Sequence, residues 1–175
     1  MKQKCLGGVN NMKKLQMEIP LILPDIPDEK DQCLDRLIQQ LQGKDGLEKV
    51  HVAAANDNGV SQLCLHYDPE IISIGRIQQL AEQTGAELTR KFGHMLTEVD
   101  GIRHIRHART IGRNLRDKKG IVEASVSGFG MVRLEFDTQI TDEAEILQAL
   151  RNEGLVIPDT QVHPKRIFTQ ADKPK

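Results

Sequence analysis

Two stretches of the sequence repeat the same order of apolar and polar positions. Residues 33–52 overlie residues 107–126 without a gap, and in both stretches apolar residues recur at spacings of three and four before a glycine, Gly46 or Gly120. A short alternating run follows each glycine. This order predicts an amphipathic helix that ends at the glycine and a strand after it, twice in the chain.

The repeat extends past these first elements. In each copy a hairpin returns the chain along a second strand, at residues 63–68 and 132–137, and a second helix follows. The second helices are predicted at residues 74–84 and 142–153, where Gly85 and Gly154 occupy the position that ends a helix. Short extended runs open and close the two copies. They lie at residues 18–23 and 86–91 in the first copy, and at residues 94–99 and 155–158 in the second.

The predicted order is therefore βαββαβ, twice. We expect an α+β protein with two tandem ferredoxin-like domains, each a four-stranded antiparallel sheet with two helices on one face. The domains are placed at residues 17–91 and 94–159, with a flexible N-terminus at 1–16 and a flexible tail at 160–175. Because the segment between the copies is so short, we expect the two domains to be closely coupled.

The composition narrows the classes of function. Only 3% of the residues are aromatic, so the core is aliphatic and stacking platforms for single-stranded nucleic acid are absent. No apolar run approaches the roughly 20 residues that cross a bilayer, so we expect a cytoplasmic protein. No nucleophile and base stand at a recognisable catalytic spacing, and the DKTG motif of a P-type ATPase is absent, so we do not expect an enzyme.

The second copy resembles the heavy-metal-associated (HMA) domain, whose signature is a Gly-Met-x-Cys-x-x-Cys-Ala loop that opens the first helix. Gly101 and Ala108 match this signature, and residues 120–126 are similar to the family's Gly-Val-x-x-Ala-x-Val strand. The first copy follows by way of the repeat. The resemblance implies a metal-binding loop, as in stand-alone metallochaperones or in the tandem N-terminal modules of heavy-metal-transporting P-type ATPases.

The two cysteine positions of the family are occupied by other residues here. They hold His104 and His107 in the second copy, and Lys30 and Cys33 in the first. Two thiolates suit Cu(I), whereas two imidazoles at the same spacing favour Zn(II), Co(II), Ni(II) or Cu(II). Cys33 offers a weaker second site. The candidates for a third ligand to the histidine pair are His94, Glu98 and Asp100.

The remaining cysteines and histidines are not predicted to bind metal. Cys5, Cys33 and Cys64 form no CxxC pair, which indicates reduced thiols rather than a disulfide framework or a cysteine zinc site. Cys64 is expected to point away from the Leu63 side of its strand. Three histidines are expected to face solvent: His51, His66 and His163.

The first helix of the second copy is strongly basic. Between residues 103 and 119 there are seven basic residues and one acid, although the whole chain has a net charge of -1. Such a stripe is suited to docking on an acidic protein partner such as a metal-transporting ATPase, rather than on nucleic acid, and a membrane would be contacted only indirectly. The stripe consists of Arg103, Arg106, Arg109, Arg113 and Arg116.

The sequence thus predicts a tandem HMA-like metal-binding protein, or the cytosolic N-terminal module of a heavy-metal P-type ATPase, that binds a transition metal through its HxxH loop. The alternative is a degenerate HMA scaffold that binds no metal and docks through the basic helix. A small-ligand sensor of the amino-acid-binding ACT type shares the βαββαβ order, but no motif of the sequence supports it.

Overall fold

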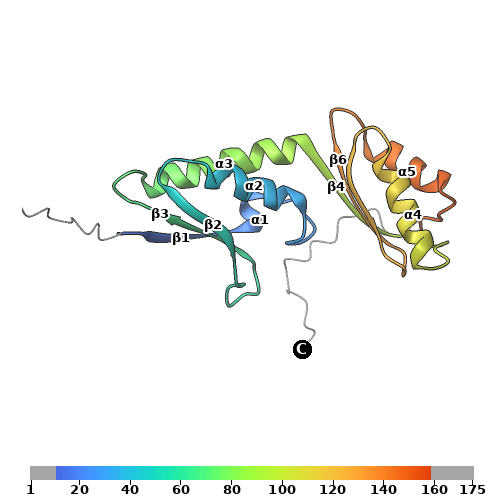
Figure 1. Ribbon diagram of the computed structural model, residues 1–175, viewed down its shortest axis with the longest axis horizontal. Coiled ribbons are helices and arrows are strands. Elements are labelled where there is room, and N and C mark those ends of the chain that lie inside the picture. The colour runs from blue at the N-terminus through green and yellow to red at the C-terminus, as the bar shows by residue number, and fades with distance from the viewer. Residues whose placement is uncertain (1–10, 159–175) are drawn as a thin grey trace, which may run out of the picture.

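The computed structural model describes residues 11–158, which form two lobes of α+β, ferredoxin-like type (Figure 1). Each lobe has one antiparallel sheet, with the strand order β1-β3-β2 in the first lobe and β4-β6-β5 in the second. The elements of the first lobe are β1 (Lys13–Glu18), α1 (Ile19–Ile22), α2 (Gln32–Gln42), β2 (Leu47–Ala53), β3 (Gln62–Tyr67) and α3 (Ile74–Lys91). Those of the second are β4 (Phe92–Glu98), α4 (Ile105–Arg116), β5 (Ile121–Val126), β6 (Met131–Asp137) and α5 (Glu143–Asn152).

Each lobe has its own aliphatic core between its sheet and its helices. In the first lobe, Leu37 and Leu41 of α2 pack with Leu65 of β3. In the second, Ile111 of α4 and Leu134 of β6 occupy the corresponding places. The apolar spacing of three and four residues explains why α2 and α4 bury one side only, so the predicted helices and their common face are confirmed.

The predicted four-stranded sheets are not observed within residues 11–158, because each sheet has three strands. In the second lobe the expected last strand is reduced to a single bridge between Asp100 and Val156. In the first lobe the segment expected as the last strand, residues 86–91, is helical. The first strand also differs from the prediction of residues 18–23, since β1 ends at Glu18 and α1 begins at Ile19.

The helix α3 runs through the glycine that was predicted to end it. Gly85 is buried in the middle of α3, and a Cβ at this position would overlap the carbonyl oxygen of Ile22 in α1. The glycine therefore permits the close approach of α1, and the helix continues through Ala86 and Leu88. By contrast, Gly154 has a φ of +81° after the end of α5, as predicted for a helix stop.

The domain boundaries were predicted at residues 17 and 94. The first falls inside β1, where Lys13 to Gln16 pair with β3, so these residues belong to the sheet rather than to a flexible N-terminus. The predicted tail at 160–175 lies outside the described residues, as do residues 1–10.

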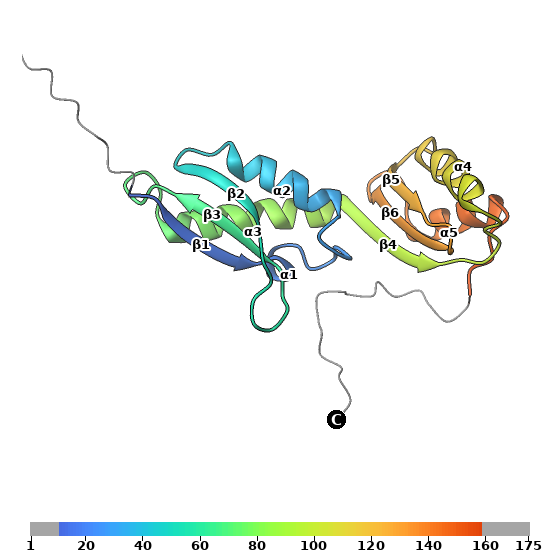
Figure 2. The same ribbon diagram turned by 60° about the horizontal axis from the view of Figure 1, so that its bottom comes forward.

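The two lobes are joined without a loop. Lys91 is the last residue of α3 and Phe92 is the first residue of β4, which runs straight from the helix into the second sheet (Figure 2). Helices α4 and α5 cover the side of this sheet that faces away from the first lobe, so its helix-free face turns toward the first lobe (Figures 1 and 2). None of the described helices is both long enough and apolar enough to cross a bilayer.

Candidate metal centre

The start of α2 is fixed by Asp31, which caps the helix. Its Oδ1 accepts a hydrogen bond of 2.8 Å from the backbone N–H of Cys33, as is usual for an aspartate at this position. The Asp31 side chain is only 3% exposed. Because the cap uses Oδ1, the other oxygen, Oδ2, points away from the helix. Cys33 is the second residue of α2, so its thiol lies in the first turn.

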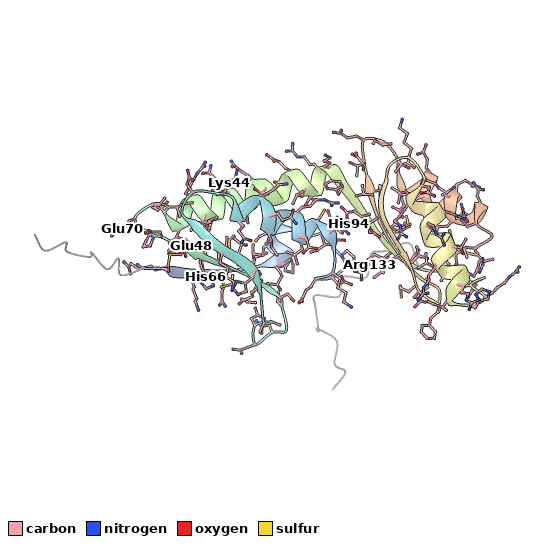
Figure 3. The ribbon with its side chains drawn as sticks, in the orientation of Figure 1. Lys44, Glu48, His66, Glu70, His94 and Arg133 are labelled. Atoms are coloured by element: carbon pink, nitrogen blue, oxygen red, sulfur yellow. The ribbon has the colours of Figure 1, made fainter. Side chains whose placement is uncertain are left out.

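The second lobe presents His94 and Glu135 to this helix end. They are opposite each other in the pairing of β4 with β6, so their side chains share one face of the sheet. Met95 and Leu134 alternate with them and point into the core of the second lobe. The face that carries His94 and Glu135 is therefore the helix-free one, which meets the first lobe (Figure 3).

One oxygen, one sulfur and one nitrogen converge at this junction. The ligand atoms of Asp31, Cys33 and His94 all lie within 4.8 Å of one another. Nδ1 of His94 is 2.8 Å from Oδ2 of Asp31, with both side chains 3% exposed, yet the contact lacks the geometry of a hydrogen bond. Two buried donor atoms this close together, with no hydrogen bond between them, are placed to share a cation.

The junction also contains a second buried carboxylate and one arginine. Oε1 of Glu135 lies 3.5 Å from Sγ of Cys33 and is paired with the guanidinium of Arg36, which itself lies 3.7 Å from that sulfur. Burial, followed by the negative charges of Glu135 and Asp31, raises the pKa of the Cys33 thiol far above its usual value. At the edge of the junction, Arg133 of β6 forms an ion pair with Asp28, one of its contacts being 2.6 Å long.

This donor set has a definite chemical preference. A single sulfur with one imidazole and carboxylate oxygens suits Zn(II) or Co(II), which accept mixed S, N and O ligands in tetrahedral geometry. Cu(I) prefers two thiolates, and among residues 11–158 only one cysteine lies at the junction. The arrangement can bind a divalent ion.

A second cluster lies on the helix-free face of the first sheet. His51 of β2 is directly opposite Cys64 of β3, and His66 is two residues further along the same strand. The ligand atoms of these three residues also lie within 4.8 Å of one another, and Nδ1 of His51 is buried without a hydrogen-bond partner. Loss of hydration, together with the nearby charge of Lys14, lowers the pKa of His66, which keeps its ring neutral and able to bind a metal.

The histidines of the HxxH loop are arranged differently. His104 caps α4, and its Nδ1 accepts a hydrogen bond of 3.1 Å from the backbone N–H of His107. Nδ1 of His107 accepts one of 3.2 Å from the backbone of Arg103, and the two ring centroids are 6.1 Å apart. Among residues 11–158, the two groups of three or more potential metal ligands include neither histidine.

The candidate third ligands do not gather at this loop as a set. His94 faces Asp31 and Cys33 across the lobe junction. Glu98 is the exposed last residue of β4, and the backbone of Asp100 bridges to Val156. The pairing of His104 with His107 as metal ligands stays a prediction.

The predicted basic stripe lies on the exposed side of α4. Arg116 is engaged with Glu123 and with the carbonyl oxygen of Ala124. The other four members form no ion pair with any described residue, and Phe129 at the tip of the neighbouring hairpin is fully exposed. These four are Arg103, Arg106, Arg109 and Arg113.

The sequence places Cys33 and His94 at separate candidate sites and does not combine them, and it does not predict the cluster of His51, Cys64 and His66. His94 is distant from Cys33 along the chain, so no local spacing connects them. The cluster of His51, Cys64 and His66 could have been suspected from the sequence, because Cys64 and His66 are two residues apart on one strand and therefore share a face of the sheet. His51 and His66 are both partly exposed, as expected, but their ligand atoms also lie within 4.8 Å of the buried thiol of Cys64, which the sequence analysis did not foresee.

Comparison with solved structures gives a strong likeness over most of the chain. No protein-family model matches the chain, and no curated protein does. The solved structure of the N-terminal extension from Cupriavidus metallidurans CzcP is 44% identical, over 82% of this chain and 97% of that chain, with a TM-score of 0.76. The N-terminal soluble domains of Bacillus subtilis CopA are 16% identical over 89% of this chain and 99% of that chain, with a TM-score of only 0.36.

Proposed function

The chain belongs to the heavy-metal-associated domain family, in the tandem form of the N-terminal regions of heavy-metal-transporting P-type ATPases, and on this premise we propose that it binds a divalent transition metal between its lobes. The ligands are Asp31, Cys33 and His94. The observation that carries the proposal is the convergence of these three buried donors, two of them 2.8 Å apart without a hydrogen bond. Zn(II) and Co(II) fit this donor set best.

The proposed setting is that of a metal-responsive module on the cytosolic side of such an ATPase. The ion is bound by residues of both lobes, so a partner protein that contacts the lobes can respond to whether the metal site is filled. We propose an ATPase as that partner. The module itself has no catalytic part in this function.

Two other places on the chain are proposed as additional metal positions. The cluster of His51, Cys64 and His66 offers two imidazoles and a thiol on an accessible sheet face. The HxxH loop offers the Nε2 atoms of His104 and His107, since both Nδ1 atoms accept backbone hydrogen bonds. Neither position is needed for the interlobe site, and each can be removed separately.

The first test is calorimetric titration of Zn(II) into the metal-free protein and its variants. We expect tight binding that is weakened by at least about tenfold in Cys33→Ser and in His94→Gln, because each removes one ligand. The matched controls are His66→Gln and the double variant His104→Ala/His107→Ala. They should leave the interlobe ion in place and lower the stoichiometry only if their own positions bind metal.

The opposite result is equally clear. If Zn(II) and Co(II) fail to bind, or bind equally well to the wild type, Cys33→Ser and His94→Gln, the interlobe site is wrong. The exposed, unpaired arginines of α4 would then favour the second function, a metal-free module that docks an acidic protein surface.

A further inference from the structure

The carboxylate of Glu135 is buried and incompletely satisfied. The residue is 3% exposed, and its Oε2 has no hydrogen-bond partner in the described part of the chain. A buried carboxylate oxygen without a donor is costly, and such atoms in folded proteins usually indicate a missing partner. Since the other oxygen lies 3.5 Å from Sγ of Cys33, the missing partner belongs to the interlobe cluster.

Arg36 is the cation that is present at this cluster. It lies three residues after Cys33, on the same side of α2, and its guanidinium pairs with Oε1 of Glu135. Its side chain is 25% exposed, and the guanidinium carbon lies 4.3 Å from the ring centroid of Phe92. The guanidinium therefore stacks on Phe92 while it pairs with Glu135, and this stacking, next to solvent, is a contact that does not depend on the carboxylate.

Resting on the proposed function, we infer that Glu135 is the fourth ligand of the interlobe metal and that Arg36 is a placeholder that gives up this carboxylate when the ion arrives. The ion is then held by two residues from each lobe. Asp31 and Cys33 come from the first lobe, and His94 and Glu135 from the second, which together supply one sulfur, one nitrogen and two oxygens for a tetrahedral ion.

The exchange is balanced in charge. A divalent ion brings two positive charges into the site, the Cys33 thiol releases one proton to solvent as its sulfur binds, and the guanidinium of Arg36 leaves Glu135. The net charge of the buried site is therefore the same before and after loading. When the site is empty, the arginine offsets the charge of Glu135, so that two buried carboxylates are not left without a nearby cation.

The test uses Co(II) as a spectroscopic probe with two variants that should have opposite effects. Glu135→Gln removes a charged ligand, so we expect Co(II) affinity to fall by about tenfold or more and the tetrahedral absorption bands to lose intensity. Arg36→Gln removes the competing cation, so we expect affinity to rise by about tenfold, because the ion then relieves an unpaired buried carboxylate. A purely structural role of the two residues predicts weaker binding in both variants.

Two control variants make each outcome decisive. Arg36→Lys keeps a competing cation and should bind Co(II) within about threefold of the wild type, which also covers a failure of Arg36→Gln to fold. Arg133→Gln removes the ion pair of Arg133 with Asp28 and should also change the Co(II) affinity by no more than about threefold. The inference is overturned if Glu135→Gln binds as the wild type does, or if both Glu135→Gln and Arg36→Gln weaken binding. Loss of Co(II) binding by the wild type would instead refute the proposed function itself.

Discussion

Cys33 shows how far the chemistry of one side chain depends on its neighbours. In the sequence it is a single thiol three residues after Lys30, which favours only a weak metal site. In the fold it is fully buried, with Asp31 on one side and Glu135 on the other. Both carboxylates oppose its ionisation, so the thiol keeps its proton until a cation offsets that charge.

This environment predicts a dependence of stability on pH in the metal-free protein. The thiol pKa is raised in the folded state, so above its ordinary value of about 8.5 the unfolded chain loses a proton that the folded chain retains. The free energy of unfolding should therefore fall as the pH rises from 8.5, by about 2 kcal/mol at pH 10. Below pH 8 the effect is absent.

The measurement is chemical denaturation at pH 7 and pH 10, with chelator and reductant present. Cys33→Ser is the matched control, because it removes the titrating thiol and keeps every other ionisable group. Its free energy of unfolding should fall less than that of the wild type over this interval. Equal losses in the two proteins would contradict the raised pKa.

Among the elements, α3 is the one whose length depends on a contact rather than on its own residues. It is 18 residues long, and Gly85 in its middle lies against the backbone of α1. A glycine inside a helix normally costs about 1 kcal/mol relative to alanine. Here the close packing of Ile22 against the helix offsets that cost.

Two glycines of α3 should therefore respond in opposite ways to alanine. Gly85→Ala places a methyl group on the carbonyl of Ile22, which a side-chain rotation cannot relieve, and should lower the free energy of unfolding by about 1–3 kcal/mol. Gly75→Ala, in the first turn of the same helix, has open space around it and should raise this free energy by about 0.5–1 kcal/mol. Denaturation of the two variants under the same conditions checks both signs.

The elements could be predicted where the signal was local. The apolar spacing in α2 and α4 located both helices, and Gly154 marked the end of α5 with its positive φ. Gly85 looks like Gly154 in the sequence, because both follow an amphipathic stretch. The difference is that α1 packs against Gly85, and this contact cannot be read from the neighbouring residues. The strand expected after Gly85 failed for this reason, since a helix that does not stop leaves no chain for a fourth strand.

At the scale of the whole molecule, the proposed interlobe site depends on a difference between the two repeats. The first copy contributes a helix end and the second contributes a sheet face, so the ligands are not repeated in either lobe. The repeat identified the two domains, but it compares only equivalent positions of the two copies, so it predicts a site within each lobe rather than one between them. The pairing of Asp31 and Cys33 with His94 follows from the docking of one lobe on the other, which the sequence does not show.

Metal binding should stabilise both lobes together. An ion held by residues of both lobes binds only the folded, closed arrangement, so free Zn(II) at 100 times its dissociation constant should add about 2.7 kcal/mol to the free energy of unfolding. Thermal unfolding with and without Zn(II) measures this shift, and His94→Ala should show little of it. A shift of equal size in His94→Ala would mean that the ion stabilises the protein from another position.

The direct continuation of α3 into β4 has a thermodynamic consequence for this site. Two lobes on a flexible tether would meet at an effective concentration in the millimolar range, and each binding event would have to order the tether first. Here no loop separates Lys91 from Phe92, so the entropy of bringing the ligand pairs together is spent when the chain folds. An ion at the proposed site would find Asp31, Cys33 and His94 already within 4.8 Å of one another, so little of its binding free energy would be lost in bringing the two lobes together.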